Sequence, residues 1–302
     1  TGKRRPEAFC YSRVRPAYPT MPPRPYKQQL DTEGESTSGR PQILATSTVM
    51  VKLTGTNKTL GATMKPATTT FTAHRIRQLR RKVEQAAKVA EHYSHSDWSV
   101  SPINVMDVLA VFTSLRIRSG YTLKMYQYRS GGDGNGFVYA LPIEAEFPEP
   151  MSDNYRLTDP PQPPNCLDHY MEAIEGDDSP LSYLQASILK RELSELGAYW
   201  HGCSWVEQYV MDRNPWEDER VSSQGLQSLI GPQEYWRLDG PCPTDWRPTV
   251  TQDAKTTTVS MPVFGRVGAE TITRYIDHYQ AGSYRFETEY ENIASGGPGI
   301  VW

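Results

Sequence analysis

Two pairs of side chains have the types and spacing to carry out chemistry. The first pair, His201 and Cys203, lies two residues apart just after a predicted helix. A thiolate beside an imidazole can act as a nucleophile, although a helix C-terminus raises the pKa of a thiol and so opposes this role. A capping histidine beside a buried structural cysteine is the alternative interpretation.

The second pair, Glu287 and Glu289, places two carboxylates on one face of a predicted strand. Glu-x-Glu spacing occurs in enzymes that transfer ADP-ribose, and paired acids also serve in glycoside hydrolysis. The arginine strand and the Ser-Thr-Ser segment that ADP-ribosyl transfer needs are not found in the expected order, because Thr46-Ser47-Thr48 comes far too early. A solvated strand face is the alternative interpretation of this pair.

A glycine-rich stretch between two predicted strands, Tyr121–Tyr128 and Phe137–Leu141, is a candidate ligand loop. Its central residues are Gly131, Gly132, Asp133, Gly134 and Asn135. A loop of this composition can close over a ligand or form a plain hairpin turn. A phosphate cradle would need a helix after the loop, whereas a strand follows here. A calcium loop that starts at Asp133 would need glycine where Val138 stands.

The element that would position these residues is a pair of predicted helices between residues 165 and 205. Asn165 is a suitable N-cap for the first helix, and Gly176 is suited to end it. The apolar face of this helix has three- and four-residue spacing and consists of Leu167, Tyr170, Met171 and Ile174. Pro180 can begin the second helix, which continues to about Trp200 with its own apolar stripe. The sequence therefore predicts a buried helical hairpin at the core.

Alternating apolar and polar residues predict strands at the C-terminal end of the chain. The three segments are Thr256–Phe264, Thr271–Tyr279 and Ser283–Tyr290. Their pattern indicates an antiparallel meander with one solvated face. We therefore predict an α+β fold, in which a helical hairpin core packs with an antiparallel β-meander. This globular body spans residues 73–302, and an extended N-terminal arm with a short β-ribbon spans residues 1–72.

The predicted arm is rich in proline and arginine. Residues 1–30 contain seven Lys and Arg against one acid, and residues 144–178 contain ten acids against one arginine. A segment like the arm favours extended polyproline-like structure and cannot form a core of its own. We expect it to dock on its own body or on a neighbouring subunit, with Arg13, Arg15 and Arg24 contacting the partner. A disordered tail and a nucleic-acid contact are the alternatives.

Residues 73–93 are predicted to form a basic amphipathic helix. Its apolar positions recur every three or four residues, and six Lys and Arg side chains stand against Glu84 and Glu91. A helix of this kind can bind nucleic acid or a coiled-coil partner. The alternative, which the short length of the repeat favours, is a helix packed on the body with a solvated basic face.

Cysteine usage and hydropathy indicate the compartment. The four cysteines are scattered without a Cys-x-x-Cys motif, as in reduced intracellular proteins. The only close pair of histidines is His92 and His95, so we predict no metal and no cofactor. No apolar run approaches the roughly 20 residues of a membrane span, and the N-terminus has no apolar signal core. We expect a soluble, cytoplasmic protein.

No motif in the sequence demands a particular chemistry, so the functional prediction depends on the charged arm. We predict a non-enzymatic assembly or interaction subunit of a larger complex, which acts with a protein partner or as a homo-oligomer. Nucleic acid is the less favoured partner. One alternative is an enzyme that uses the thiol and imidazole or the paired carboxylates, for example in glycosyl or ADP-ribosyl transfer. Another is a carbohydrate- or nucleotide-binding module that uses surface Trp and Tyr.

Overall fold

The computed structural model describes residues 66–88, 98–130, 133–150, 160–199, 204–217 and 229–300. All of them belong to one unit of the chain, which begins at Leu60. Most of the predicted arm lies outside the described residues, including Arg13, Arg15 and Arg24. The same is true of His201 and Cys203.

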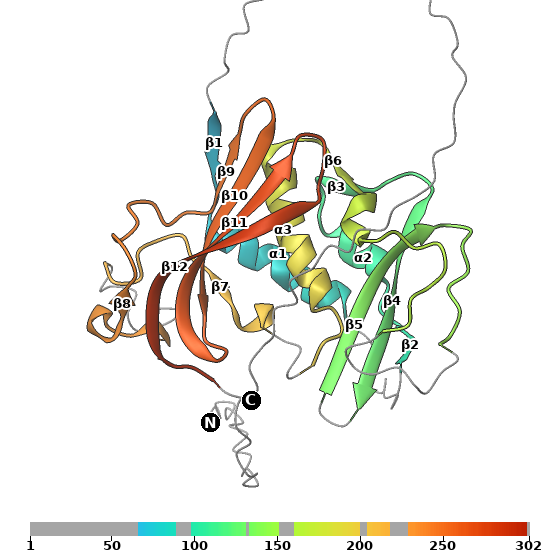
Figure 1. The fold of residues 1–302 in the computed structure, drawn as a ribbon, viewed down its shortest axis with the longest axis horizontal. Coiled ribbons are helices and arrows are strands. Elements are labelled where there is room, and N and C mark those ends of the chain that lie inside the picture. The colour runs from blue at the N-terminus through green and yellow to red at the C-terminus, as the bar shows by residue number, and fades with distance from the viewer. Residues whose placement is uncertain are drawn as a thin grey trace, which may run out of the picture. The chain divides into compact units, whose positions relative to one another are not determined.

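The described part of the chain is mostly β, with twelve strands in three antiparallel sheets. The largest sheet has the order β1-β9-β10-β11-β12-β8, and β7 pairs with β10 beside this path. Its strands are β1 (Ala67–Thr70), β7 (Tyr209–Val210), β8 (Arg237–Leu238), β9 (Thr249–Gln252), β10 (Thr256–Gly265), β11 (Ala269–Gln280) and β12 (Phe286–Pro298). In Figure 1 the long strands β10 to β12 curl along their length.

Two smaller sheets complete the β structure. The first is a hairpin with a short added strand, and its members are β2 (Trp98–Val100), β4 (Tyr121–Ser130) and β5 (Asp133–Pro142). The second pairs β3 (Leu115–Ile117) with β6 (Ile174–Gly176).

Three α-helices lie among these sheets, and each begins at a side chain that caps its first turn. The helices are α1 (Ala73–Ala86), α2 (Val105–Ala110) and α3 (Pro180–Ser194). Thr72, Asn104 and Ser179 accept hydrogen bonds from the free amides of the first turns. Three short 3-10 helices are η1 (Tyr170–Ala173), η3 (Trp205–Glu207) and η5 (Gln233–Tyr235). Among the described residues, no helix is both long and apolar enough to cross a membrane.

Helix α3 is central to the packing. It contacts β9 and β10 of the largest sheet, β5 of the hairpin and α1, and in Figure 1 it lies between the largest sheet and the hairpin. Because neighbours surround it, Ile188 and Leu189 are fully buried, and even Ser182 and Ser187 are excluded from water. Each serine hydroxyl is paired with a tyrosine hydroxyl, Ser182 with Tyr284 in the turn between β11 and β12, and Ser187 with Tyr279 of β11.

The predicted fold class, an α+β fold around a helical hairpin, is wrong. Only the second of the two predicted helices exists, as α3, and the segment of the first contains η1 and β6 instead. Asn165 has a φ of 60° rather than the extended conformation of an N-cap. Gly176 lies in β6 against Tyr284, where a Cβ would be 2.3 Å from the phenol oxygen. The backbone of β6 is thus paired with β3 and cannot make helical hydrogen bonds.

His169, at the start of the short helix η1, should make the stability of the fold depend on pH. His169 Nδ1 accepts a hydrogen bond from the Met171 amide at 3.1 Å. Burial, aided by the nearby Lys190 and Arg285 charges, lowers the pKa of His169 below its usual 6.5. The unfolded chain therefore binds this proton more tightly, so the contribution of His169 to stability is complete above pH 6.5 and decreases as the pH falls toward the folded pKa.

In urea unfolding between pH 5 and pH 7.5, we expect the stability difference between the wild type and His169→Asn to shrink as the pH is lowered. Asn can still accept the amide hydrogen bond but does not titrate in this range. A difference that stays constant over the whole range contradicts the assignment.

Candidate binding site: a basic groove beside helix α3

The paired carboxylates Glu287 and Glu289 lie on the exposed face of β12. Glu289 Oε2 is 3.3 Å from His278 Nε2 of β11, and both side chains are at least half exposed. Thr288, between the two glutamates, faces the other way and donates a hydrogen bond to the buried Asp277. This placement fits a solvated strand face.

The candidate ligand loop is shorter than its composition suggests. Asp133, Gly134 and Asn135 belong to β5, where they pair with β4, and Gly131 and Gly132 lie outside the described residues. Gly134 also exchanges backbone hydrogen bonds with Tyr199. The segment after α3 therefore crosses β5 closely, and glycine provides the space for that crossing. No group of His, Cys, Asp and Glu within the described ranges is arranged to hold a metal ion.

The acidic segment at residues 144–178 is partly neutralised by the body of the protein. Glu172 forms an ion pair with Arg285 at 2.6 Å, and Glu175 forms one with Arg116 at 3.1 Å. Asp177 accepts two hydrogen bonds from Ser179, which lowers the pKa of Asp177. These three carboxylates are thus already paired within the body of the protein.

The basic helix has a different environment, because its charges remain on the surface. Four Lys and Arg side chains of α1 are exposed, against one exposed acid, Glu84; the four are Arg75, Arg77, Arg81 and Lys82, and Lys88 is exposed just beyond the helix end at Ala86. Ile76 and Val83, on the opposite face, are buried in the core. Helix α1 is therefore packed on the body, with a face that attracts anions.

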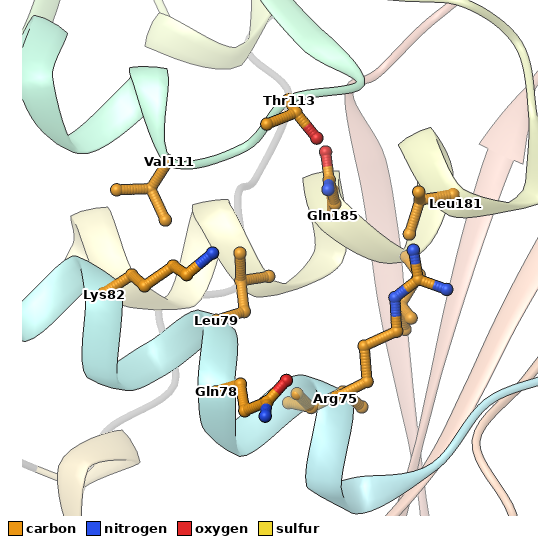
Figure 2. A pocket seen from close by; sticks show the side chains of 10 residues that line it. Arg75, Gln78, Leu79, Lys82, Val111, Thr113, Leu181 and Gln185 are labelled. Atoms are coloured by element: carbon orange, nitrogen blue, oxygen red, sulfur yellow. The ribbon is translucent and has the colours of Figure 1, made fainter.

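A groove runs between α1, α3 and the turn after α2, with a cavity volume of about 180 Å³ (Figure 2). Its aliphatic floor consists of Ile76, Leu79, Val111, Leu181 and Leu184. Its polar lining consists of Arg75, Gln78, Lys82, Thr113 and Gln185, with no acidic residue. We call this set of ten residues the basic groove.

Two cations and one amide give the basic groove its electrostatic character. Arg75 and Lys82 are seven residues apart, roughly 10 Å along the helix axis, and neither has an ion pair within the described part of the chain. Gln185 is 5% exposed, and its Oε1 accepts a hydrogen bond from the Ser114 amide at 2.8 Å. The oxygen is thus occupied, and the amide NH₂ is the group left to donate to an occupant.

Arg80 holds the two helical walls of the basic groove together. Its Nε donates to Glu192 of α3 at 2.8 Å, and its two terminal nitrogens donate to the carbonyls of Gln208 and Trp205. The guanidinium carbon of Arg80 lies 4.4 Å from the centroid of the Trp205 ring. The indole Nε1 of Trp205 donates to the same Glu192 oxygen. Burial raises the pKa of Glu192, and the adjacent Arg80 charge opposes this effect.

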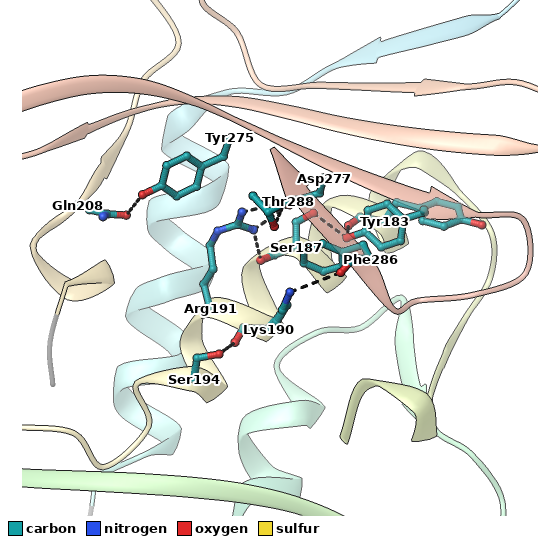
Figure 3. Close-up of polar contacts among 11 residues, drawn as sticks. Tyr183, Ser187, Lys190, Arg191, Ser194, Gln208, Tyr275, Asp277, Phe286 and Thr288 are labelled. Carbon is teal, nitrogen blue, oxygen red and sulfur yellow. Dashed lines mark hydrogen bonds and ion pairs between the residues drawn. The ribbon is translucent and has the colours of Figure 1, made fainter. Parts of the chain in front are cut away.

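A second polar cluster lies farther along α3 (Figure 3). Arg191 donates to both oxygens of Asp277 at 2.8 Å, and it also donates to the Ser187 carbonyl. Burial lowers the pKa of Arg191, but the hydrogen bonds and charge of Asp277 outweigh this and raise the pKa overall. Lys190 Nζ lies over the Phe286 ring at 4.2 Å, and burial lowers its pKa. This cluster fastens α3 to β11 and β12.

Sequence reasoning found only one wall of the basic groove. The charge pattern of residues 73–93 pointed to a basic helix, but Thr113 and Gln185 come from separate segments with no motif to connect them. Their proximity depends on how α3 packs in the core.

Comparison with protein-family models, curated proteins and solved structures finds no match for this chain. The groove and the fold thus define the class as a mostly β protein with a basic surface groove.

Proposed function

We propose that this protein is a non-enzymatic interaction protein that binds an acidic segment of a protein partner in the basic groove. The observation that carries the proposal is an aliphatic floor between two cations that have no acidic counterpart in the lining. An aliphatic side chain of the partner would cover the floor, and the apolar surface of both would be removed from water. Flanking carboxylates would pair with Arg75 and Lys82.

The lining favours an acidic protein segment over nucleic acid. Single-stranded nucleic acid is held by basic side chains together with aromatic rings on which bases stack. No aromatic residue lines the basic groove. A phosphate backbone would also leave the aliphatic floor without an apolar partner.

The first test reverses the two charges of the groove with Arg75→Glu and Lys82→Glu in one variant. The probe is a labelled synthetic peptide with one leucine between glutamates, and fluorescence anisotropy measures its binding. We expect the dissociation constant to rise by at least about tenfold, because two attractive contacts become repulsive. A peptide with serine in place of leucine should also bind less tightly.

The matched control is Arg77→Glu with Lys88→Glu, which makes the same change in net charge on exposed residues outside the groove. This control should retain most of the peptide affinity. Equal losses in both variants would show a diffuse charge effect and overturn the assignment to the groove. Tighter binding of a single-stranded oligonucleotide than of the peptide would identify nucleic acid as the partner instead.

A further inference from the structure

A turn at residues 142–147 presents the chemistry that the basic groove lacks. Ile143 is 65% exposed, and Glu144 and Glu146 are exposed beside it. Neither glutamate has an ion pair within the described ranges. We call residues 142–147 the acidic turn. It combines one aliphatic side chain with two free carboxylates.

The acidic turn is held in place by the β4–β5 hairpin. The Ile143 amide donates to the Gly120 carbonyl at 3.0 Å, and the Ala145 amide donates to the Pro142 carbonyl at the same distance. Phe147 stacks on Tyr126 with ring centroids 4.2 Å apart, and the Tyr126 hydroxyl donates to the Pro148 carbonyl. Little backbone entropy is therefore lost when the turn docks on another surface.

The acidic turn and the basic groove are complementary, yet they do not meet within one chain. The lining of the groove contains no residue of the turn. The groove offers an aliphatic floor and two cations, whereas the turn offers an aliphatic tip and two acids. A second copy of the chain would bring the two surfaces together and would cover Ile143.

We propose that the basic groove of one copy receives the acidic turn of a second copy, so that the chain assembles head to tail. This inference depends on the proposed function and names the partner of the same groove. Because groove and turn are different surfaces, the interface is heterologous, and every terminal copy keeps one free groove or one free turn. Such an interface closes into a ring or continues as an open chain.

The test uses two charge-reversed variants of the full chain. The groove variant carries Arg75→Glu and Lys82→Glu, and the turn variant carries Glu144→Lys and Glu146→Lys. Sedimentation velocity and native mass measurement follow the assembly of each variant across a range of concentrations. The wild type should grow in mass with concentration. Each variant alone should self-associate at least about tenfold more weakly than the wild type, because like charges then meet at the interface.

Mixing provides the specific readout. An equimolar mixture of the two variants should assemble again, because unaltered turns meet unaltered grooves and reversed turns meet reversed grooves. A chain that carries all four substitutions should also self-associate, whereas Ile143→Ser alone should weaken assembly without any change in charge. The control Arg77→Glu with Lys88→Glu should assemble like the wild type. Restored assembly also shows that the variants are folded.

Two results would overturn the inference. One is a wild type that stays monomeric over the whole concentration range. The other is an assembly that forms equally well in both single variants. If the acidic peptide still binds the groove of a monomeric wild type, the head-to-tail inference fails while the proposed function stands. If the peptide does not bind either, both fail.

Discussion

Replacing Asp277 with Ala is expected to lower the free energy of unfolding by about 3–5 kcal/mol, because a buried cation then loses its partner. Asp277 is fully buried and accepts two hydrogen bonds from Arg191 and a third from Thr288. The Arg191 side chain is 11% exposed and cannot turn to water without leaving the core. The variant retains a charged guanidinium with no carboxylate beside it.

Urea unfolding of three further variants separates charge from packing. Thr288→Val removes one hydrogen bond and should lower the free energy of unfolding by about 1 kcal/mol. Asp277→Asn preserves shape but not charge, so its effect should exceed that of Thr288→Val. The double change Arg191→Leu with Asp277→Leu should recover much of the loss, since an apolar pair can replace a buried ion pair. A loss below about 1 kcal/mol for Asp277→Ala would contradict the assignment of a paired buried charge.

Gly136→Ala is the second change with a large expected effect. A Cβ at this position of β5 would lie 1.9 Å from the carbonyl oxygen of Leu196, which is backbone and cannot move like a flexible side chain. The segment that follows α3 would have to separate from the hairpin. We expect a loss of about 3 kcal/mol or more in the free energy of unfolding, measured by urea titration.

The matched control for Gly136→Ala is Gly240→Ala, where an added Cβ meets no atom within 4 Å. This control should be close to neutral. Gly134→Ala is an intermediate case, because its Cβ would lie 3.2 Å from both the Tyr128 carbonyl and the Tyr199 side chain. A Gly136→Ala variant as stable as the Gly240→Ala control would show that the crossing of α3's trailing segment over β5 is looser than the contacts indicate.

The C-terminal strands are the part of the fold that the sequence locates best. Alternation between apolar and polar residues marks β11, whose buried Ile272 and Tyr279 lie on strand positions of opposite parity. The two side chains therefore face opposite sides of the sheet, where Tyr279 packs into the main core and Ile272 packs with Phe264 and Trp236 in a second cluster. No pattern within the strand reveals that both faces are covered, because the covering segments, such as the one with Trp236, lie elsewhere in the sequence.

The predicted helical hairpin failed because spacing alone cannot show which partner a short segment will have. Tyr170, Met171 and Ile174 have helical spacing over one turn, and one turn is too short to form a stable helix by itself. Pairing with β3 and the contact of Gly176 with Tyr284 decide its conformation. Both partners are distant in the sequence.

The candidate site shows the same division between local and distant information. The basic face of α1 is visible in the sequence because its charges share one helix. The floor of the groove is not visible, since Leu181 and Val111 approach α1 only in the packed core. In the sequence, the acidic turn is visible only as part of an acidic segment. Its match to the aliphatic floor of the groove depends on the exposure of Ile143, which only the structure shows.

The contacts of Arg80 bear on the heat-capacity change that is expected when the basic groove is occupied. Since one guanidinium holds α1 to Glu192 and to the carbonyls of Gln208 and Trp205, both walls are in position before binding. Binding in the groove then requires no folding of a helix. The heat-capacity change of binding therefore comes only from the aliphatic area that is covered at the floor. If the proposed partner binds there, we expect binding across a broad temperature range, because the walls of the groove need no prior ordering.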